Sequence, residues 1–299
     1  MHPWVRRVAT WSGNHMKTPL LAFALAAALP LALFAQWPDY PSSKTPRGPD
    51  GKPKLDAPTP RTADGKPDLS GVWDFRGPII PRRGGRPQDG PPPPPPHGDT
   101  PPGGIAVATF RNIGQGFRDG LPLRPEAAEL LKRRKAENGK DNPDAHCLPL
   151  GLTQLHLHPQ PRKIVQTPTD IVILYEAQAG IRQIFTDGRT LPPDDVQPWW
   201  YGYSIGHWDG DTLVVETTGF RDDVWLDIDG SPLTNSGKMT ERFRRINYGT
   251  LQIDITIEDP KMYTAPFTVR VTDRIMPDTE LIEFICQEND RSGPHLVGK

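Results

Sequence analysis

Residues Tyr201–Phe220 read YGYSIGHWDGDTLVVETTGF, and this stretch decides between two fold classes. It contains Gly202-Tyr203-Ser204-Ile205-Gly206, which has the letters of a nucleophile elbow. An elbow needs a strand before the serine and a helix after it. Here the chain instead passes through the turn residues Asp209-Gly210 into Thr212–Thr218, which is rich in β-branched residues. The stretch therefore predicts a β-hairpin in which Ser204 is a strand or turn residue and not a nucleophile.

Alternating apolar and polar residues continue beyond this hairpin. Leu251–Glu258 places an apolar residue at every second position, as in a strand with one buried face. Further strands are predicted at Gly71–Phe75, Ile164–Gln166, Ile171–Glu176, Arg182–Thr186, Lys238–Ile246, Thr268–Arg274 and Glu280–Gln287. So many short strands with almost no helix predict a mostly β fold: an antiparallel lipocalin-like barrel or, as the alternative, a β-sandwich. In the barrel, the first strand closes the ring by pairing near the last.

The other segments of the chain have distinct compositions. The 299 residues include 28 glycines and 37 prolines, crowded into the first half. We predict a signal peptide at 1–35, a linker at 36–67, a β-barrel domain at 68–289 with a Gly/Pro-rich insertion at 77–122, and a C-terminal tail at 290–299. Within the insertion, Pro91–Pro96 predicts polyproline II or disorder. One helix is predicted at 125–137, begun by Pro125 and ended by Asn138-Gly139.

The N-terminus predicts export. Leu20–Ala35 is apolar apart from Pro30, basic residues precede it, and it ends in a small residue, as signal peptides do. Translation from Met1 or from Met16 would retain this signal. The mature protein is therefore expected to be periplasmic or extracellular, with no membrane span after cleavage. A net charge of −1 argues against a nucleic-acid partner, and the oligomeric state stays open.

Cys147 and Cys286 are the two cysteines of the chain. An even number of cysteines in an oxidising compartment predicts a disulfide between them.

Three charged residues are candidates for acid/base catalysis. Glu241 shares a strand face with apolar neighbours, so it must meet a cation or have its pKa raised. Asp187 and Arg189 form a charged pair in a predicted turn. These residues are consistent with a cofactor-free hydrolase, lyase or isomerase. The alternative is structural: Glu241 forms an ion pair with Arg182 or Arg189.

Aromatic residues suggest a different function, the binding of a small apolar or aromatic ligand in a cavity. The expected lining residues are Trp200, Tyr201, Trp208, Glu216 and Trp225, together with Glu241. No cofactor is implied. A third hypothesis is a structural or docking module that acts through the proline-rich arm.

Two patterns resemble metal sites, and we assign neither as one. His156 and His158 share a face if Leu155–His158 is extended, and His207 or a carboxylate could be the third ligand. The prolines that follow, and the lack of any other mark of a site, argue against zinc. Asp227-Ile228-Asp229-Gly230 lacks the later ligands of a calcium loop and is interpreted as a turn.

A series of motifs resembles a large family of exported bacterial proteins without an assigned activity. The motifs are Asp64–Trp73 (DGKPDLSGVW), Cys147-Leu148-Pro149, Phe185–Arg189 (FTDGR), Gly202–Val215 (GxSxGxWxGDTLVV) and Thr240–Phe243 (TERF). The resemblance implies an export signal and a β-rich domain, and it brings no catalytic residues. Gly71-Val72-Trp73 also resembles the opening motif of lipocalin-like barrels, in which the tryptophan plugs the closed end.

Overall fold

The computed structural model describes residues 40–75, 98–193 and 197–284. The chain divides into two units, Met1–Tyr40 and Pro41–Lys299, and the second unit contains the fold described below. The predicted signal peptide, the run Pro91–Pro96 and the predicted tail at 290–299 lie outside the described residues.

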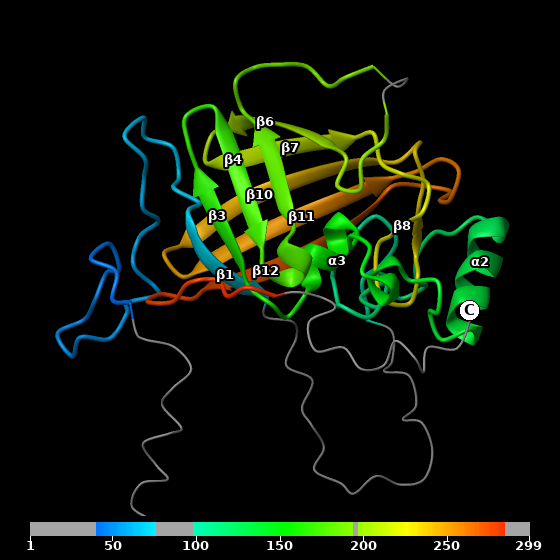
Figure 1. Ribbon diagram of the computed structural model, residues 1–299, viewed down its shortest axis with the longest axis horizontal. Coiled ribbons are helices and arrows are strands. Elements are labelled where there is room, and N and C mark those ends of the chain that lie inside the picture. Colours follow the sequence, from blue (N-terminus) through cyan, green and yellow to red (C-terminus); the bar gives the residue numbers. More distant parts are fainter. Residues whose placement is uncertain (1–39, 76–97, 194–196, 285–299) are drawn as a thin grey trace, which may run out of the picture. The chain divides into compact units, whose positions relative to one another are not determined.

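Nine strands form a closed barrel (Figure 1). In sheet order they are β1 (Gly71–Phe75), β3 (Arg162–Gln166), β4 (Asp170–Tyr175), β5 (Ile181–Phe185), β6 (Tyr203–Asp209), β7 (Thr212–Thr218), β10 (Lys238–Asn247), β11 (Thr250–Glu258) and β12 (Phe267–Ile275). The ring closes where Trp73 of β1 pairs with Ile275 of β12. The predicted barrel is therefore confirmed over the sandwich. Neighbouring strands of the barrel are antiparallel, except that β5 and β6 run parallel where Ile184 pairs with Ser204.

Three short strands lie outside this ring. β2 (Ile105–Val107) pairs in parallel with β12, on the half of its edge that β1 leaves free. β8 (Val224–Trp225) and β9 (Pro232–Leu233) form a separate two-stranded sheet. The predicted hairpin is present as β6 and β7, with no helix after Ser204, so the serine is a strand residue.

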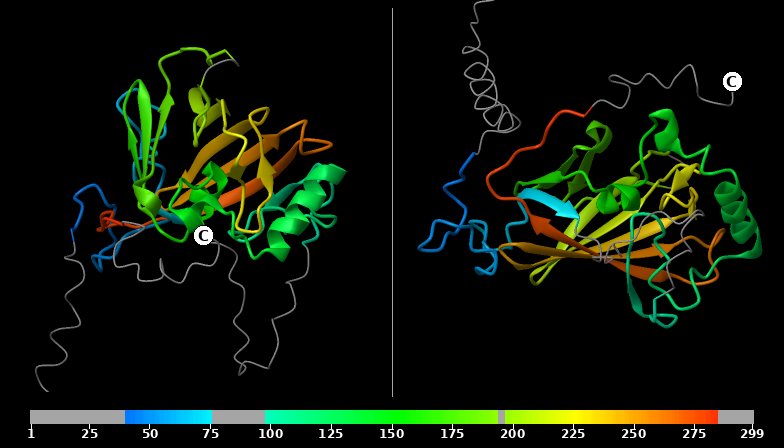
Figure 2. Two further views of the ribbon diagram at one scale, coloured as in Figure 1. Left: turned by 45° about the vertical axis from the view of Figure 1, so that its right-hand side comes forward. Right: turned by 90° about the horizontal axis from the view of Figure 1, so that it is seen from below.

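The helices lie at one end of the barrel. α2 (Pro125–Ala136) confirms the predicted helix, with proline in its first turn and basic residues in its last, and it packs beside the barrel (Figure 2). The structure also has two 3-10 turns: η2 (Pro143–His146), between α2 and α3, and η3 (Ala177–Ala179), between β4 and β5.

The short helix α3 (Leu152–Leu157) corrects the expectation that Leu155–His158 is extended. All six residues of α3 are buried, and the Arg162 side chain donates hydrogen bonds to the carbonyl oxygens of Leu155 and His156. Burial and this cap stabilise a helix that is too short to form alone.

The prediction of a last strand at Glu280–Gln287 is wrong for its described part, because residues 280–284 do not form a strand. β12 is the last strand in the described part of the chain, and its edge is already occupied by β1 and β2. The segment is held by side chains instead: Lys163 pairs with Glu280, and the amide of Ile282 donates to Glu176.

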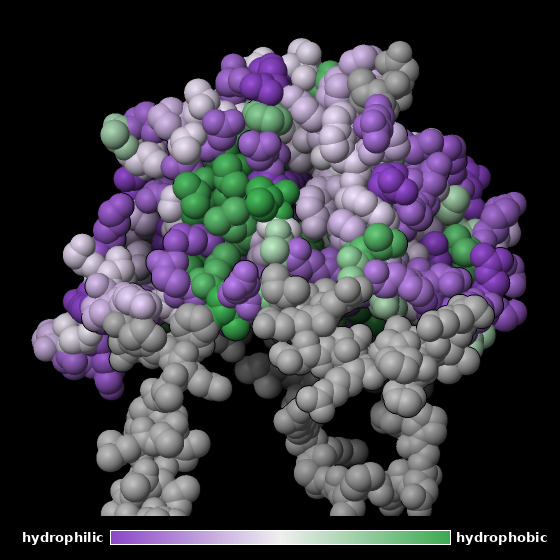
Figure 3. Space-filling model, in the orientation of Figure 1, coloured by the Kyte–Doolittle hydropathy of each residue, from purple (hydrophilic) through white to green (hydrophobic). Residues whose placement is uncertain are grey.

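The barrel interior follows the alternation predicted for Leu251–Glu258, whose apolar side chains are fully buried. Trp73 is also fully buried, donates from Nε1 to the Leu69 carbonyl at 3.0 Å, and lies 4.8 Å below the Arg245 guanidinium. Apolar side chains also gather on the outward face of β3 and β4 (Figure 3), where Val165 is 38% exposed.

The predicted linker at 36–67 is packed against the barrel over its described part. Two equivalent turns, Arg47–Pro53 and Arg61–Pro67, are each closed by a β-bridge. In each, the arginine donates to the carbonyl of the glycine four residues later and pairs with an aspartate of the barrel unit, Asp278 or Asp211. We refer to these as the tandem turns.

Candidate functional site

Charged and polar side chains from five elements meet inside the barrel. Glu241 points inward from β10, as its strand face predicts, and is fully buried. Arg182 reaches it from β5, in agreement with the ion pair suggested from the sequence. His156 of α3 places Nε2 2.9 Å from Glu241 Oε1. Ser204 of β6 and Thr217 of β7 complete the interior network, as we call these five residues.

The arginine holds the network together. Arg182 donates to both carboxylate oxygens of Glu241, with Nη1 3.1 Å from Oε1. Its Nη2 also donates to Thr217 Oγ1 at 3.0 Å and to Ser204 Oγ at 3.1 Å. Ser204 is thus bound to a cation and to a threonine 2.9 Å away, and no histidine of the described residues hydrogen-bonds to it. This geometry excludes the hydrolase triad that the GxSxG letters suggest.

Electrostatics fix the protonation states of the network. Burial would raise the pKa of Glu241, but Arg182 and His156 outweigh it and lower that pKa to about 2. Burial lowers the pKa of His156 to about 4, against the opposing effect of Glu241. Glu241 is therefore an anion held by its partners, and a carboxylate of such low pKa is a weak general base.

One nitrogen in the network has no partner. Because Glu241 accepts a hydrogen bond from His156 Nε2, the neutral ring carries its proton there and leaves Nδ1 as an acceptor. Nδ1 has no hydrogen-bond partner among the residues the structure describes. The ring packs instead against two aromatic rings, Tyr175 at 6.0 Å and Phe243 at 5.9 Å between centroids.

A second buried ion pair joins Arg162 of β3 to Asp273 of β12. Burial raises the pKa of Asp273 to about 6, and Arg162 opposes the shift. Arg162 also caps α3, so this pair ties the helix to both strands. The Arg162–Asp273 pair was not predicted from the sequence, whereas the Arg182–Glu241 pair was. The sequence feature that could have indicated these buried arginines is an arginine two positions before an isoleucine in the same strand, which places both side chains on one face. Arg162 precedes Ile164 and Arg182 precedes Ile184 in this way.

The other two catalytic candidates, Asp187 and Arg189, are not part of the buried interior network. Asp187 and Arg189 form a partly exposed ion pair at 2.6 Å. Hydrogen bonding to Arg189 lowers the pKa of Asp187. Arg189 also lies 3.8 Å above the Phe185 ring and donates to Tyr203 Oη at 3.0 Å. No contact joins this pair to Glu241 among those the described residues make, so the three candidates do not form one site.

The predicted ligand-binding residues are likewise dispersed. Trp225 is buried below Arg134 of α2, 4.4 Å from the guanidinium, outside the barrel. Glu216 faces outward and pairs with Lys238 at 2.6 Å. Trp200 lies below Arg221 at 4.5 Å.

Tyr201 and Trp208 are partly buried and pack against the barrel core. Burial raises the pKa of Tyr201, and Trp208, on β6, packs against the core. Trp208 shares the inward face of β6 with Ser204, whereas Trp225 lies on β8 outside the barrel, so the predicted lining residues do not all border the barrel interior.

The suggested metal patterns have other roles. His158 accepts a hydrogen bond from the Gln160 amide and lies edge-on to Phe110, apart from the Glu241 contact of His156. Asp227 accepts hydrogen bonds from Ile113, Gly230 and Ser231, as expected for the predicted turn. Over the part of the chain that is described, no cluster of three metal-binding side chains occurs.

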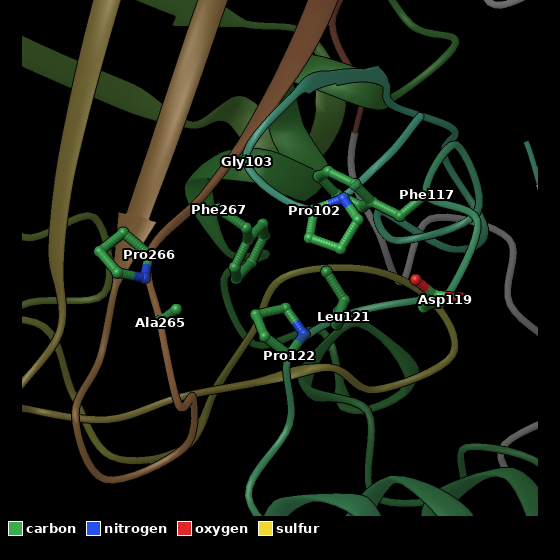
Figure 4. Close-up of a pocket in the computed structure, with 10 residues that line it drawn as sticks. Pro102, Gly103, Phe117, Asp119, Leu121, Pro122, Ala265, Pro266 and Phe267 are labelled. Atoms are coloured by element: carbon green, nitrogen blue, oxygen red, sulfur yellow. The ribbon is translucent and has the colours of Figure 1, made fainter. Parts of the chain in front are cut away.

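The structure contains an apolar pocket that the sequence did not indicate. It has a volume of about 140 Å³ and lies where the chain before α2 meets the β11–β12 connection (Figure 4). We call it the rim pocket. Its walls are Pro102, Gly103, Phe117, Asp119, Gly120, Leu121, Pro122, Ala265, Pro266 and Phe267.

Hydrogen bonds fix the walls of the rim pocket. The amide of Thr264 donates to the Pro122 carbonyl at 2.8 Å, and the amide of Arg118 donates to Thr100 at 2.9 Å. Phe117 and Phe267 meet edge to face with centroids 6.2 Å apart. The pocket therefore has an aromatic base and walls held by backbone contacts, with one carboxylate, Asp119, at its edge (Figure 4).

Cys147 does not carry a free thiol. Cys286 lies outside the described residues, so its pairing with Cys147 stays a prediction.

Comparisons with known proteins found no match for the chain. No protein-family model matches it, and neither a curated protein nor a solved structure is found to be similar. The resemblance to exported bacterial proteins therefore remains an expectation. In the described ranges, no helix has the length and apolar character needed to cross a membrane.

Proposed function

We propose that this protein binds a small aromatic or apolar group in the rim pocket. The observation that carries the proposal is the pocket itself: about 140 Å³, with Phe117, Leu121 and Phe267 among its walls. Cavities of about 150 Å³ lined by aliphatic and aromatic side chains bind benzene or xenon. Binding of a small apolar or aromatic ligand is also the function suggested by the aromatic residues of the sequence, but the proposed site is lined by different residues.

The charge at the pocket edge narrows the ligand class. Asp119 is exposed and is the one charged residue in the lining. Its carboxylate favours a ring that bears an amine or another hydrogen-bond donor and disfavours an anionic ring.

The interior network does not favour the catalytic alternative. Glu241 is held by Arg182 and His156, and the rim pocket is lined by other residues. Buried polar networks of this kind help to specify one arrangement of a core.

The binding experiment compares toluene, benzylamine and benzoate by calorimetric titration. We expect saturable binding of benzylamine and toluene, with benzoate the weakest. Ala265→Phe places a ring at the exposed pocket mouth and should abolish binding. Ala63→Phe, the same substitution on an exposed tandem turn, should leave it unchanged. Binding that survives Ala265→Phe, or no binding of any probe, would refute the proposal.

We further infer that the protein acts outside the cytoplasm, on the strength of the apolar run Leu20–Ala35 and the basic residues before it. N-terminal sequencing of the exported product should find Gln36 first. A product that retains Leu20–Ala35 would contradict the inference.

A further inference from the structure

Three aromatic side chains form a continuous surface on the outside of the barrel. Phe185 and Tyr203 have ring centroids 5.3 Å apart, and Tyr203 and Trp199 have centroids 5.6 Å apart. Trp199 is 39% exposed, although tryptophan is a residue that folding normally buries. We call these three residues the aromatic platform.

The parallel pairing of β5 with β6 builds the platform. Ile184 and Ser204 face the interior at this pairing, so their neighbours Phe185 and Tyr203 face outward. Trp199 is fixed beside them, because its amide donates to the Gly219 carbonyl at 2.9 Å. Arg189, bound to Asp187, supports the platform from the Phe185 end.

An open pocket continues the platform beyond Trp199. Its volume is about 410 Å³, and its lining includes Pro192, Pro198 and Gly219. A side chain at Gly219 would come within 3.1 Å of the Trp199 ring, so the indole lies directly against this glycine. The pocket thus adjoins the Trp199 end of the platform through Gly219, and we refer to the platform and the pocket together as the groove.

We propose that this groove binds the polyproline run Pro91–Pro96 of a second copy of the chain. Polyproline II helices dock in aromatic-lined grooves, and their low conformational entropy reduces the cost of binding. Such a helix leaves its carbonyls unbonded, and an exposed indole N–H is a suitable donor for them.

The path of the chain favours a second copy as the source of the prolines. The residues on either side of the segment that contains Pro91–Pro96 are anchored on the β12 side of the barrel. Phe75 pairs with Asp273 of β12, and the Gly98 amide donates to Gln115 at 2.8 Å, next to β2. The platform lies on β5 and β6, with β3 and β4 between it and β1 in the sheet.

The test titrates a synthetic peptide of residues 88–98 into the full chain and follows tryptophan fluorescence. We expect saturable binding, weakened about tenfold or more by Trp199→Ala. Phe185→Ser is a second platform variant, in case the first does not fold. Tyr40→Ala removes an aromatic side chain that is 55% exposed elsewhere and should change nothing. No saturable binding, or equal binding to Trp199→Ala, would overturn the proposal.

Sedimentation then tests the origin of the occupant. The full chain should self-associate with rising concentration, and replacement of Pro91–Pro96 by serine should remove this association while the variant binds the peptide more tightly. A chain that stays monomeric at every concentration would refute a second copy as the partner. The platform shares no residue with the rim pocket, so this result is independent of the proposed ligand binding.

Discussion

At the residue scale, Glu241 illustrates what a charged side chain does inside a barrel. Its strand face predicts that it is inward and needs a cation, and both features are observed with Arg182. Its histidine partner was not predictable, because His156 lies in a short helix stabilised by tertiary contacts. The catalytic role suggested for Glu241 depends on an accessible carboxylate, whereas this one is fully enclosed.

Glu241→Gln should strongly destabilise the protein. The substitution leaves the buried Arg182 without its counter-charge, which costs about 3–5 kcal/mol in comparable cases. Chemical denaturation provides the measurement. Glu216→Gln, at the partly exposed pair with Lys238, should cost less than about 1 kcal/mol. Equal costs for the two variants would show that the Glu241 pair is not enclosed.

His156 should make stability depend on pH in a defined window. Its pKa is lowered from 6.5 to about 4 in the folded chain, so the unfolded chain takes up a proton first as the pH falls. The free energy of unfolding should therefore decrease as the pH falls from 6.5 to 4, by up to ~1.4 kcal/mol per pH unit.

Variants isolate this contribution from the opposite effect of Asp273, whose raised pKa adds stability at acidic pH. The His156→Asn variant should lose the slope between pH 6.5 and 4, while His207→Asn, at an exposed position of β6, should retain it. A wild-type slope in His156→Asn would contradict the assignment.

At the element scale, the tandem turns lie in a segment that was predicted to be a linker but packs against the barrel. The recurrence of Asp-Gly-Lys-Pro is visible in the sequence and suggests turns, but a linker was predicted because nothing local shows what the turns touch. Their arginines bind Asp211 and Asp278, which are distant in the sequence.

Helix α2 was predictable because its start and stop signals are local, whereas α3 depends on Arg162 and on burial.

Gly51→Ala and Gly65→Ala should each lower the free energy of unfolding by about 1 kcal/mol. Both glycines have left-handed backbone angles, φ +76° and +80°, with no neighbour within 4 Å of an added β-carbon. The cost is therefore conformational and should be equal at the two positions. Thermal unfolding measures it, with Ala63→Ser as the surface control. Clearly unequal costs would show that the turns are not equivalent.

At the scale of the whole molecule, the barrel was predictable because alternation along the chain dictates a sheet with one buried face. Closure by the first strand was also expected, although the partner is β12 and not the 280–287 segment. The rim pocket was not predictable. Its walls come from three separated segments, around Pro102, Leu121 and Pro266, and none of them has a regular pattern.

The disulfide is a prediction about the whole chain as well. Intact-mass measurement of exported protein without reductant should find Cys147 linked to Cys286. The Ile282 amide donates to Glu176, next to η3, and the amide of Leu150 binds Gln178 of η3. These contacts bring the segments that precede Cys286 and follow Cys147 to the same turn. Two free thiols in exported protein would refute the link.

The rim pocket is tested most directly by diffraction from crystals pressurised with xenon. Xenon occupies apolar cavities of this size without requiring a hydrogen bond. We predict a xenon atom between Phe117, Leu121 and Phe267, absent from Ala265→Phe crystals and retained in Ala63→Phe crystals. A rim pocket without xenon in the wild type, or one equally occupied in Ala265→Phe, would contradict the claim that this protein holds a small apolar group there.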